Sequence, residues 1–142
     1  MLTYKIHLFR HGITRANLEG KYVGLTDYPL CQEGIDALKE YVKGKDYPAI
    51  EKIYTSPLRR CRETAKILYP GYKTFDVPQL MEMDFGLYEG KTLDELQNDE
   101  TFIAWSRDSM HNAPPEGEDG LTFIRRVIKG LDDVFKDMMA ND

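Results

Sequence analysis

The chain has 142 residues, enough for one core, and we expect residues 1–142 to form a single domain. Hydrophobic residues make up 42% and charged residues 30%, a composition typical of soluble globular proteins that excludes wholesale disorder and a membrane span. A formal net charge of -5 has the wrong sign for binding nucleic acid or an acidic membrane surface.

The cysteines and the first residues indicate the compartment. Cys31 and Cys61 are too few for a disulfide framework, and without CxxC spacing they speak against a cysteine zinc site. Near the N-terminus Lys5 interrupts the apolar run, so the segment lacks the apolar stretch of a secretory signal. We therefore expect a cytoplasmic protein with reduced thiols and with no nucleic-acid or membrane partner.

In the first half of the chain, predicted strands alternate with predicted helices. Residues 4–9 favour a strand, and a long polar loop follows to residue 31. Helical spacing of apolar residues predicts a helix over 32–43, and residues 52–55 predict a second strand. A helix that starts at Ser56-Pro57 and closes at Pro70-Gly71 then leads to a third strand at 73–77.

The second half is predicted to be mainly helical. Thr92 and Glu95 have capping-box spacing and open a short helix, and a weakly helical segment follows residue 99. After a proline-containing loop at 111–119, a long helix covers about 122–139. Its apolar residues recur with a helical period, namely Phe123, Val127, Leu131, Val134 and Met138.

This alternation predicts the fold class α/β. Strands linked by helices form βαβ units, and these require a mostly parallel central sheet covered on both faces, a three-layer α/β/α arrangement. Ligands bind beyond the carboxyl ends of such strands. There the sequence has Arg10-His11-Gly12 and, after the next strand, Ser56 followed by Arg59, Arg60 and Arg62. The sequence therefore predicts a local anion site on an otherwise acidic protein.

Several segments together resemble a known family. They are LFRHGITRAN at 8–17, GLTDYPL at 24–30, TSPLRRCRETA at 55–65, LME at 80–82 and PPEGE at 114–118. In content and order they resemble the histidine phosphatase superfamily, which is also called the phosphoglycerate-mutase-like family. Within it they resemble the small phosphatase branch, which includes α-ribazole phosphatases. The resemblance implies a phosphoglycerate-mutase-like fold that here lacks its C-terminal strand or strands.

The resemblance implies that His11 and Glu82 are the catalytic residues. A covalent mechanism needs a nucleophile that is unprotonated near neutral pH, and imidazole, with an ordinary pKa of about 6.5, meets that need. His11 matches the family's nucleophile. The leaving alkoxide needs a proton and water later needs a base, and a carboxyl group can supply both in turn. Glu82 matches that position.

The resemblance also implies four phosphate-binding residues. Planar guanidinium groups suit the oxygens of a phosphate monoester, and Arg10 and Arg60 match the family's arginines. Asn17 is expected to donate an amide hydrogen bond to the same oxygens. Thr14 could do likewise, but hydrogen bonding to the local backbone is an equal alternative.

Other polar residues are predicted to be structural. Surface or helix-pairing roles are expected for Arg59 and Arg62, and structural roles for Asp27, Glu89 and Glu118. His7 is expected to pack within the first strand, and His111 lies in a loop. No group of residues has the spacing of metal ligands, so we expect neither a metal nor a cofactor.

The leading prediction is a metal-independent phosphatase that hydrolyses small phosphomonoesters, such as α-ribazole phosphate, through a phosphohistidine. It would bind phosphate or sulfate ions. Two alternatives stay open: phosphoryl transfer of the phosphoglycerate mutase type, and a non-catalytic phosphate-binding or interaction module. The sequence does not predict which phosphomonoester is used. Packing is the preferred role for the aromatic residues Phe85, Tyr88, Phe102 and Trp105.

Members of the family carry a second histidine, in a His-Gly pair after a late strand, and this sequence has none. The resemblance therefore implies a C-terminally truncated chain with weak activity. A sheet without that strand would expose an edge or an apolar face, which favours a homodimer as one way to cover it.

Overall fold

The computed structural model describes residues 1–45 and 47–141, and it has an α/β fold. Strands β1 (Ile53–Thr55) and β2 (Thr74–Asp76) run parallel, with Tyr54 opposite Phe75. Helix α3 (Arg59–Leu68) connects them, which makes the βαβ unit that the alternation of elements predicts. The two predicted strands and the helix between them are confirmed within one to three residues at each end.

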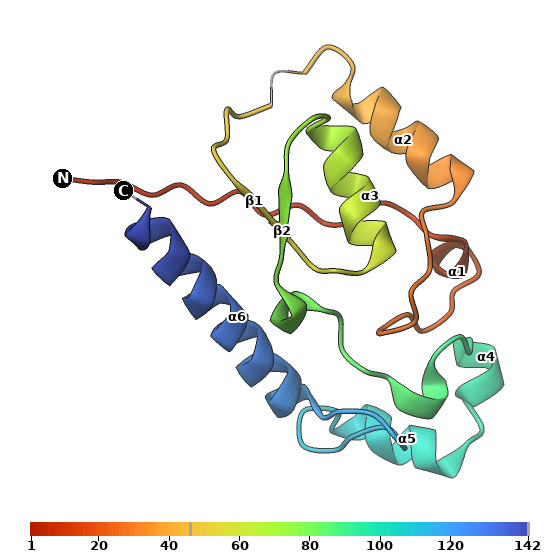
Figure 1. Ribbon diagram of the computed structural model, residues 1–142. Coiled ribbons are helices and arrows are strands. Elements are labelled where there is room, and N and C mark those ends of the chain that lie inside the picture. The colour runs from red at the N-terminus through yellow and green to blue at the C-terminus, as the bar shows by residue number, and fades with distance from the viewer. Residues whose placement is uncertain (46, 142) are drawn as a thin grey trace.

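Helices cover both sides of this small sheet (Figure 1). Helix α2 (Gln32–Val42) packs on α3, and α3 packs on β1. On the other side, α6 (Gly120–Ala140) packs against the short 3-10 helix η1 (Pro78–Leu80). The two helices approach closely at Gly130, since a Cβ atom there would lie only 2.8 Å from the Cβ atom of Gln79. The expected layers are therefore present around a sheet of two strands.

The predicted first strand, residues 4–9, is wrong. This segment is exposed and extended without being a strand, and His7 is exposed rather than packed. A strand needs a neighbour at hydrogen-bonding distance, and among the described residues β1 pairs with β2 alone. Residues 2–9 and 49–56 instead line one cavity. Among the described residues no strand pairs with this segment, so its β-favouring composition does not make it a strand.

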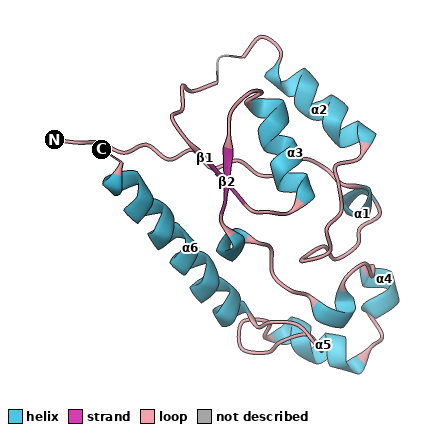
Figure 2. Cartoon of the chain, in the orientation of Figure 1, coloured by secondary structure: helices cyan, strands magenta, loops and turns pink. Residues whose placement is uncertain are grey.

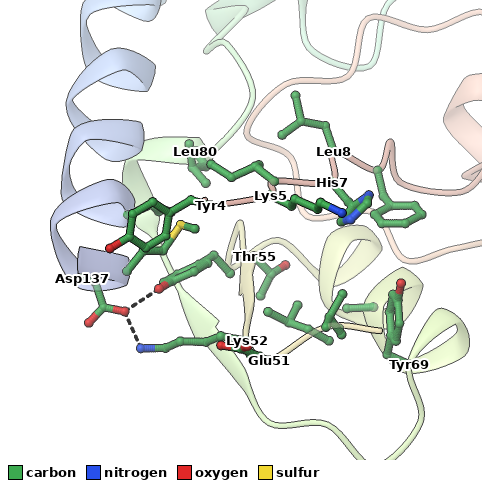
Figure 3. A pocket seen from close by; sticks show the side chains of 18 of the residues that line it. Tyr4, Lys5, His7, Leu8, Glu51, Lys52, Thr55, Tyr69, Leu80 and Asp137 are labelled. Carbon is green, nitrogen blue, oxygen red and sulfur yellow. Dashed lines mark hydrogen bonds and ion pairs between the residues drawn. The ribbon is translucent and has the colours of Figure 1, made fainter. Parts of the chain in front are cut away.

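A cavity of about 640 Å³ lies between the N-terminal segment, β1, α3 and α6 (Figure 3). Leu80 and Leu131 line it, and one end reaches His11. At its other side Lys52 and Tyr54 of β1 both bond to Asp137 of α6. Partial burial is the largest cause that raises the pKa of Tyr54 to about 12. The hydrogen bond to Asp137 and the negative charge of Asp137 raise it in the same direction.

The remaining helices are short (Figure 2). Helix α1 (Arg15–Leu18) lies in the predicted loop, η2 is Gly86–Tyr88, α4 is Leu93–Leu96 and α5 is Glu100–Arg107. Polar side chains cap three of them, α1, α4 and α5. Thr92 caps α4 by accepting a hydrogen bond from the Glu95 N–H, as its spacing predicts. Asp99 caps α5 in the same way. No helix of residues 1–45 and 47–141 is long and apolar enough to cross a membrane.

The main apolar core lies under these short helices. It consists of Met83, Tyr88, Leu96, Phe102 and Trp105, with Tyr22, Phe85 and Phe123 packed against it. The prediction that the aromatic residues pack together is confirmed, since their rings lie edge-to-face or tilted at 5–6 Å. The predicted apolar face of α6 is also confirmed, because Val134 is buried and none of the other four residues is exposed.

Candidate active site

His11 follows the N-terminal segment, and its ring orientation is fixed by the backbone. Its Nδ1 lies 2.6 Å from the carbonyl oxygen of Gly12, so Nδ1 carries the proton and donates. The lone pair is then on Nε2. Gly12 itself is held because its N–H donates to Thr64 Oγ1 at 2.9 Å, and a Cβ atom there would lie 2.7 Å from Leu38 Cδ1. The close packing around Gly12 thus presents one imidazole nitrogen as a potential nucleophile.

The surroundings keep this imidazole neutral. Burial is the largest cause that lowers the pKa of His11 below 6.5, and the positive charges of Arg60 and Arg10 lower it further. The hydrogen bond to Gly12 and the negative charge of Glu82 act in the opposite direction without reversing the shift. These interactions also show that the structure brings His11, Arg10, Arg60 and Glu82 into one region.

Arg60 is buried, with 1% of its surface exposed, and two of its nitrogens hold a neighbouring loop. Nη1 donates to the carbonyl of Thr26 at 2.9 Å and Nη2 to the carbonyl of Gly24 at 2.6 Å. Its Nε is buried and has no hydrogen-bond partner among the described residues. A buried guanidinium N–H without a partner is costly, so Nε is a donor with unused hydrogen-bonding capacity.

Asn17 and Thr14 form a capping box at the start of α1. The side-chain oxygen of Asn17 accepts from the backbone N–H and from the hydroxyl of Thr14, both at 2.9 Å. This leaves the amide nitrogen of Asn17 as the group that could reach an anion. Thr14 is fully buried and its hydroxyl is used within the box, which is the local role that the sequence left open. We therefore leave Thr14 out of the proposed phosphate site.

Glu82 is half-buried in the segment that follows η1, and Arg10 is exposed. One carboxylate oxygen of Glu82 accepts a hydrogen bond from the backbone N–H of Met83 at 2.8 Å. This bond orients the carboxyl group and leaves its other oxygen available for proton transfer. Glu82, a titratable group, therefore lies in the same region as His11 and two guanidinium groups.

The loop at residues 24–26 is held from both sides. Arg60 binds its carbonyls, and the Glu89 carboxylate accepts from the N–H groups of Gly24 at 2.9 Å and Leu25 at 2.7 Å. Asp27, next along the chain, accepts from the backbone N–H of Arg59 at 2.7 Å and so caps α3. The predicted structural roles of Glu89 and Asp27 are confirmed.

Three other polar residues form ion pairs outside the candidate site. Arg59 lies 3.5 Å from Glu63 one turn along α3, and Arg62 bonds to Asp76 of β2. His111, for which the sequence showed no partner, pairs with Asp108 at 3.0 Å. In residues 1–45 and 47–141, no group of three or more His, Cys, Asp or Glu side chains is placed to hold a metal ion.

A neutral imidazole, two arginines and a carboxyl group lie near one another in this α/β protein, and these are the group types that suit the binding of a phosphoryl group. The comparison with known families agrees with this class. Residues 6–141 match the histidine phosphatase superfamily (branch 1), and the chain belongs to that family.

Three relatives place the chain within the family. It is 33% identical to the adenosylcobalamin/α-ribazole phosphatase of Salmonella typhimurium, over 94% of this chain and 69% of that protein. It is 34% identical to a 2,3-bisphosphoglycerate-dependent phosphoglycerate mutase of Bifidobacterium longum, over 81% of this chain and 50% of that protein. The crystal structure of the α-ribazole phosphatase from Shigella flexneri superimposes with a TM-score of 0.81 at 29% identity, covering 91% and 66% of the two chains. The chain thus spans 50% to 69% of these relatives' lengths.

Proposed function

We propose that this protein is a metal-independent phosphatase of small phosphomonoesters that forms a phosphohistidine at His11. The observation that carries the proposal is the ring of His11, whose Nδ1 is fixed on the Gly12 carbonyl and whose pKa is lowered, mainly by burial. Nε2 is then an unprotonated nucleophile at neutral pH. The relatives named α-ribazole phosphatases support an α-ribazole-phosphate-like substrate.

The chemistry proceeds in two steps. Nε2 of His11 forms a bond to phosphorus as the bond from phosphorus to the leaving oxygen breaks, and the Glu82 carboxyl group donates its proton to that oxygen. Glu82, now a carboxylate, accepts a proton from water as the water oxygen attacks phosphorus and the N–P bond breaks. Arg10, the Nε of Arg60 and the amide of Asn17 would bind the phosphoryl oxygens.

The proposal is tested by labelling with a phosphomonoester that carries ³²P. A label on His11 that is stable to alkali and lost in acid is expected, and His11→Ala should abolish it. His111→Ala is the matched control, because that exposed histidine pairs with Asp108 away from the core. Glu82→Gln should slow labelling by alkyl phosphates more than by p-nitrophenyl phosphate, which needs no proton on its leaving group. Label that persists in His11→Ala would refute the proposal.

Phosphoglycerate mutase-type transfer is the second candidate, favoured by the Bifidobacterium relatives. The two activities differ in the acceptor. A mutase returns the phosphoryl group to a phosphoglycerate, whereas a phosphatase transfers it to water. The products formed from labelled His11 therefore separate them, and binding of phosphate without any label would instead favour a non-catalytic module.

The proposal includes two further expectations, the domain organisation and the cellular location. We treat residues 1–142 as one histidine-phosphatase-like domain, supported by the match over residues 6–141. A cytoplasmic location is supported by Cys31 and Cys61, which are separate free thiols.

A further inference from the structure

We propose that Arg126 and Glu118 are positioning residues that hold the segment carrying Glu82 at the correct place for proton transfer. This inference rests on the proposed function, because it assigns Glu82 the acid/base role. Neither residue has such a role by sequence pattern; Arg126 lies in α6 and Glu118 lies two residues before that helix begins. The pair is largely shielded from water, with side chains 25% and 16% exposed.

Arg126 of α6 binds the backbone of the Glu82 segment directly. Its Nη1 donates to the carbonyls of Gln79 at 2.9 Å and Met81 at 2.8 Å, and its Nη2 donates to the carbonyl of Glu82 at 3.2 Å. One guanidinium group thereby fixes three of the four carbonyls between residues 79 and 82. The planar fork of arginine makes this possible, whereas the single ammonium group of lysine could not reach all three.

Glu118 completes the clamp from the other side of Glu82. Its Oε1 lies 2.5 Å from Arg126 Nη2 and accepts from the backbone N–H of Asp84 at 3.0 Å. The backbone N–H of Glu118 in turn donates to the carbonyl of Asp84 at 3.0 Å. The chain is therefore held at residues 79, 81 and 82 by Arg126 and at residue 84 by Glu118.

The consequence for chemistry is a fixed carboxyl group. Between the clamped residues, the Met83 N–H donates to Glu82 Oε1, so the side chain is oriented by a backbone that is itself held in place. Proton transfer requires hydrogen-bond distance to the leaving oxygen, and a displacement of about 1 Å can cost about 100-fold in rate. Loosening the clamp should thus impair the step that needs the proton and spare the step that does not.

The test compares Arg126→Lys with Arg125→Lys, a matched control on the exposed side of the same helix. The rate of His11 phosphorylation is measured with an alkyl phosphate and with p-nitrophenyl phosphate. Arg126→Lys should lower the ratio of the alkyl rate to the aryl rate by about 10- to 100-fold, and Arg125→Lys should leave it unchanged. Because both rates come from one preparation, the ratio is independent of the fraction of protein that is folded. An unchanged ratio in Arg126→Lys would overturn the inference.

A second readout keeps the inference testable if the proposed function fails. If the wild-type protein forms no phosphohistidine, hydrogen exchange at the Met83 amide decides whether Arg126 positions this segment. Arg126→Lys should speed that exchange about 10-fold or more while leaving amides of β2 protected. Unchanged protection at Met83 would overturn the inference even then.

Discussion

Replacing Arg60 by methionine should remove most of the protection that phosphate gives to the fold. The Nε of Arg60 is buried without a hydrogen-bond partner among the described residues, and the positive charge of the guanidinium group lowers the pKa of His11. Methionine preserves an apolar stem of similar length, so it leaves no large cavity. It removes the donor that an anion would meet beside the imidazole.

The magnitude follows from linkage. Phosphate at 100 times its dissociation constant stabilises the wild-type protein by about 2.7 kcal/mol. One hydrogen bond from a charged donor contributes about 1.5–3 kcal/mol, and every 1.4 kcal/mol is about tenfold in affinity, so the loss is roughly 10- to 140-fold. At the same phosphate concentration the stabilisation of the variant falls to about 0.3–1.3 kcal/mol. With about 2–4 °C per kcal/mol, a phosphate-induced shift in Tm of about 5–10 °C falls to roughly 1–5 °C.

Thermal unfolding followed by circular dichroism, with and without phosphate, measures the two shifts. Arg60→Met also loses the bonds to Gly24 and Thr26, so the variant will unfold at a lower temperature even without phosphate. For that reason the measured quantity is the shift caused by phosphate. Arg62→Met is the control, since Arg62 is exposed and bonds to Asp76. Equal phosphate-induced shifts in Arg60→Met and in the wild-type protein would refute the reasoning.

Two further predictions concern pH and association. Because the pKa of His11 is lowered in the folded state, mainly by burial, the unfolded chain binds more protons below pH 6.5. The free energy of unfolding should therefore fall as pH drops from 6.5 towards the folded pKa, and His11 should not affect it above pH 6.5. Urea titrations of wild-type and His11→Asn protein check this, and parallel pH curves would contradict it. Leu2 and Leu8 are 74% and 85% exposed beside the cavity, so we expect self-association that depends on concentration, and sedimentation showing monomer at all concentrations would contradict that.

Local patterns in the sequence predicted those elements whose stability is itself local. The α6 helix carries a long periodic apolar face, and Thr92 caps its helix through a residue three positions away. Helix α1 was missed because it has four residues, although the spacing of Thr14 and Asn17 is a capping signal that would have found it. The prediction of a strand at residues 4–9 was wrong because a strand requires pairing with a neighbouring strand. A local sequence pattern does not reveal that neighbour.

For the site, the sequence predicted residue types and their neighbourhood but not their bonding. His11, Arg10, Arg60 and Glu82 do lie in one region. The carbonyl partners of Arg60 are 34 and 36 residues away, and those of Arg126 are 44 to 47 residues away. Hydrogen bonds to backbone carbonyls carry no signature in side-chain identity, so they emerge only once the chain is folded.

Arg60 and Arg126, which are buried and half-buried, show how irregular segments are held in the described part of the chain, where the sheet has two strands. Each uses its planar fork to fix the carbonyls of an irregular segment, residues 24–26 for Arg60 and residues 79–82 for Arg126. Neither segment is part of a strand or an α-helix, so its carbonyls would otherwise need water. A carboxylate then holds N–H groups of the same segment or its neighbour, Glu89 in the first case and Glu118 in the second. Both irregular segments are thus fixed by side chains in place of the hydrogen-bond ladder of a sheet.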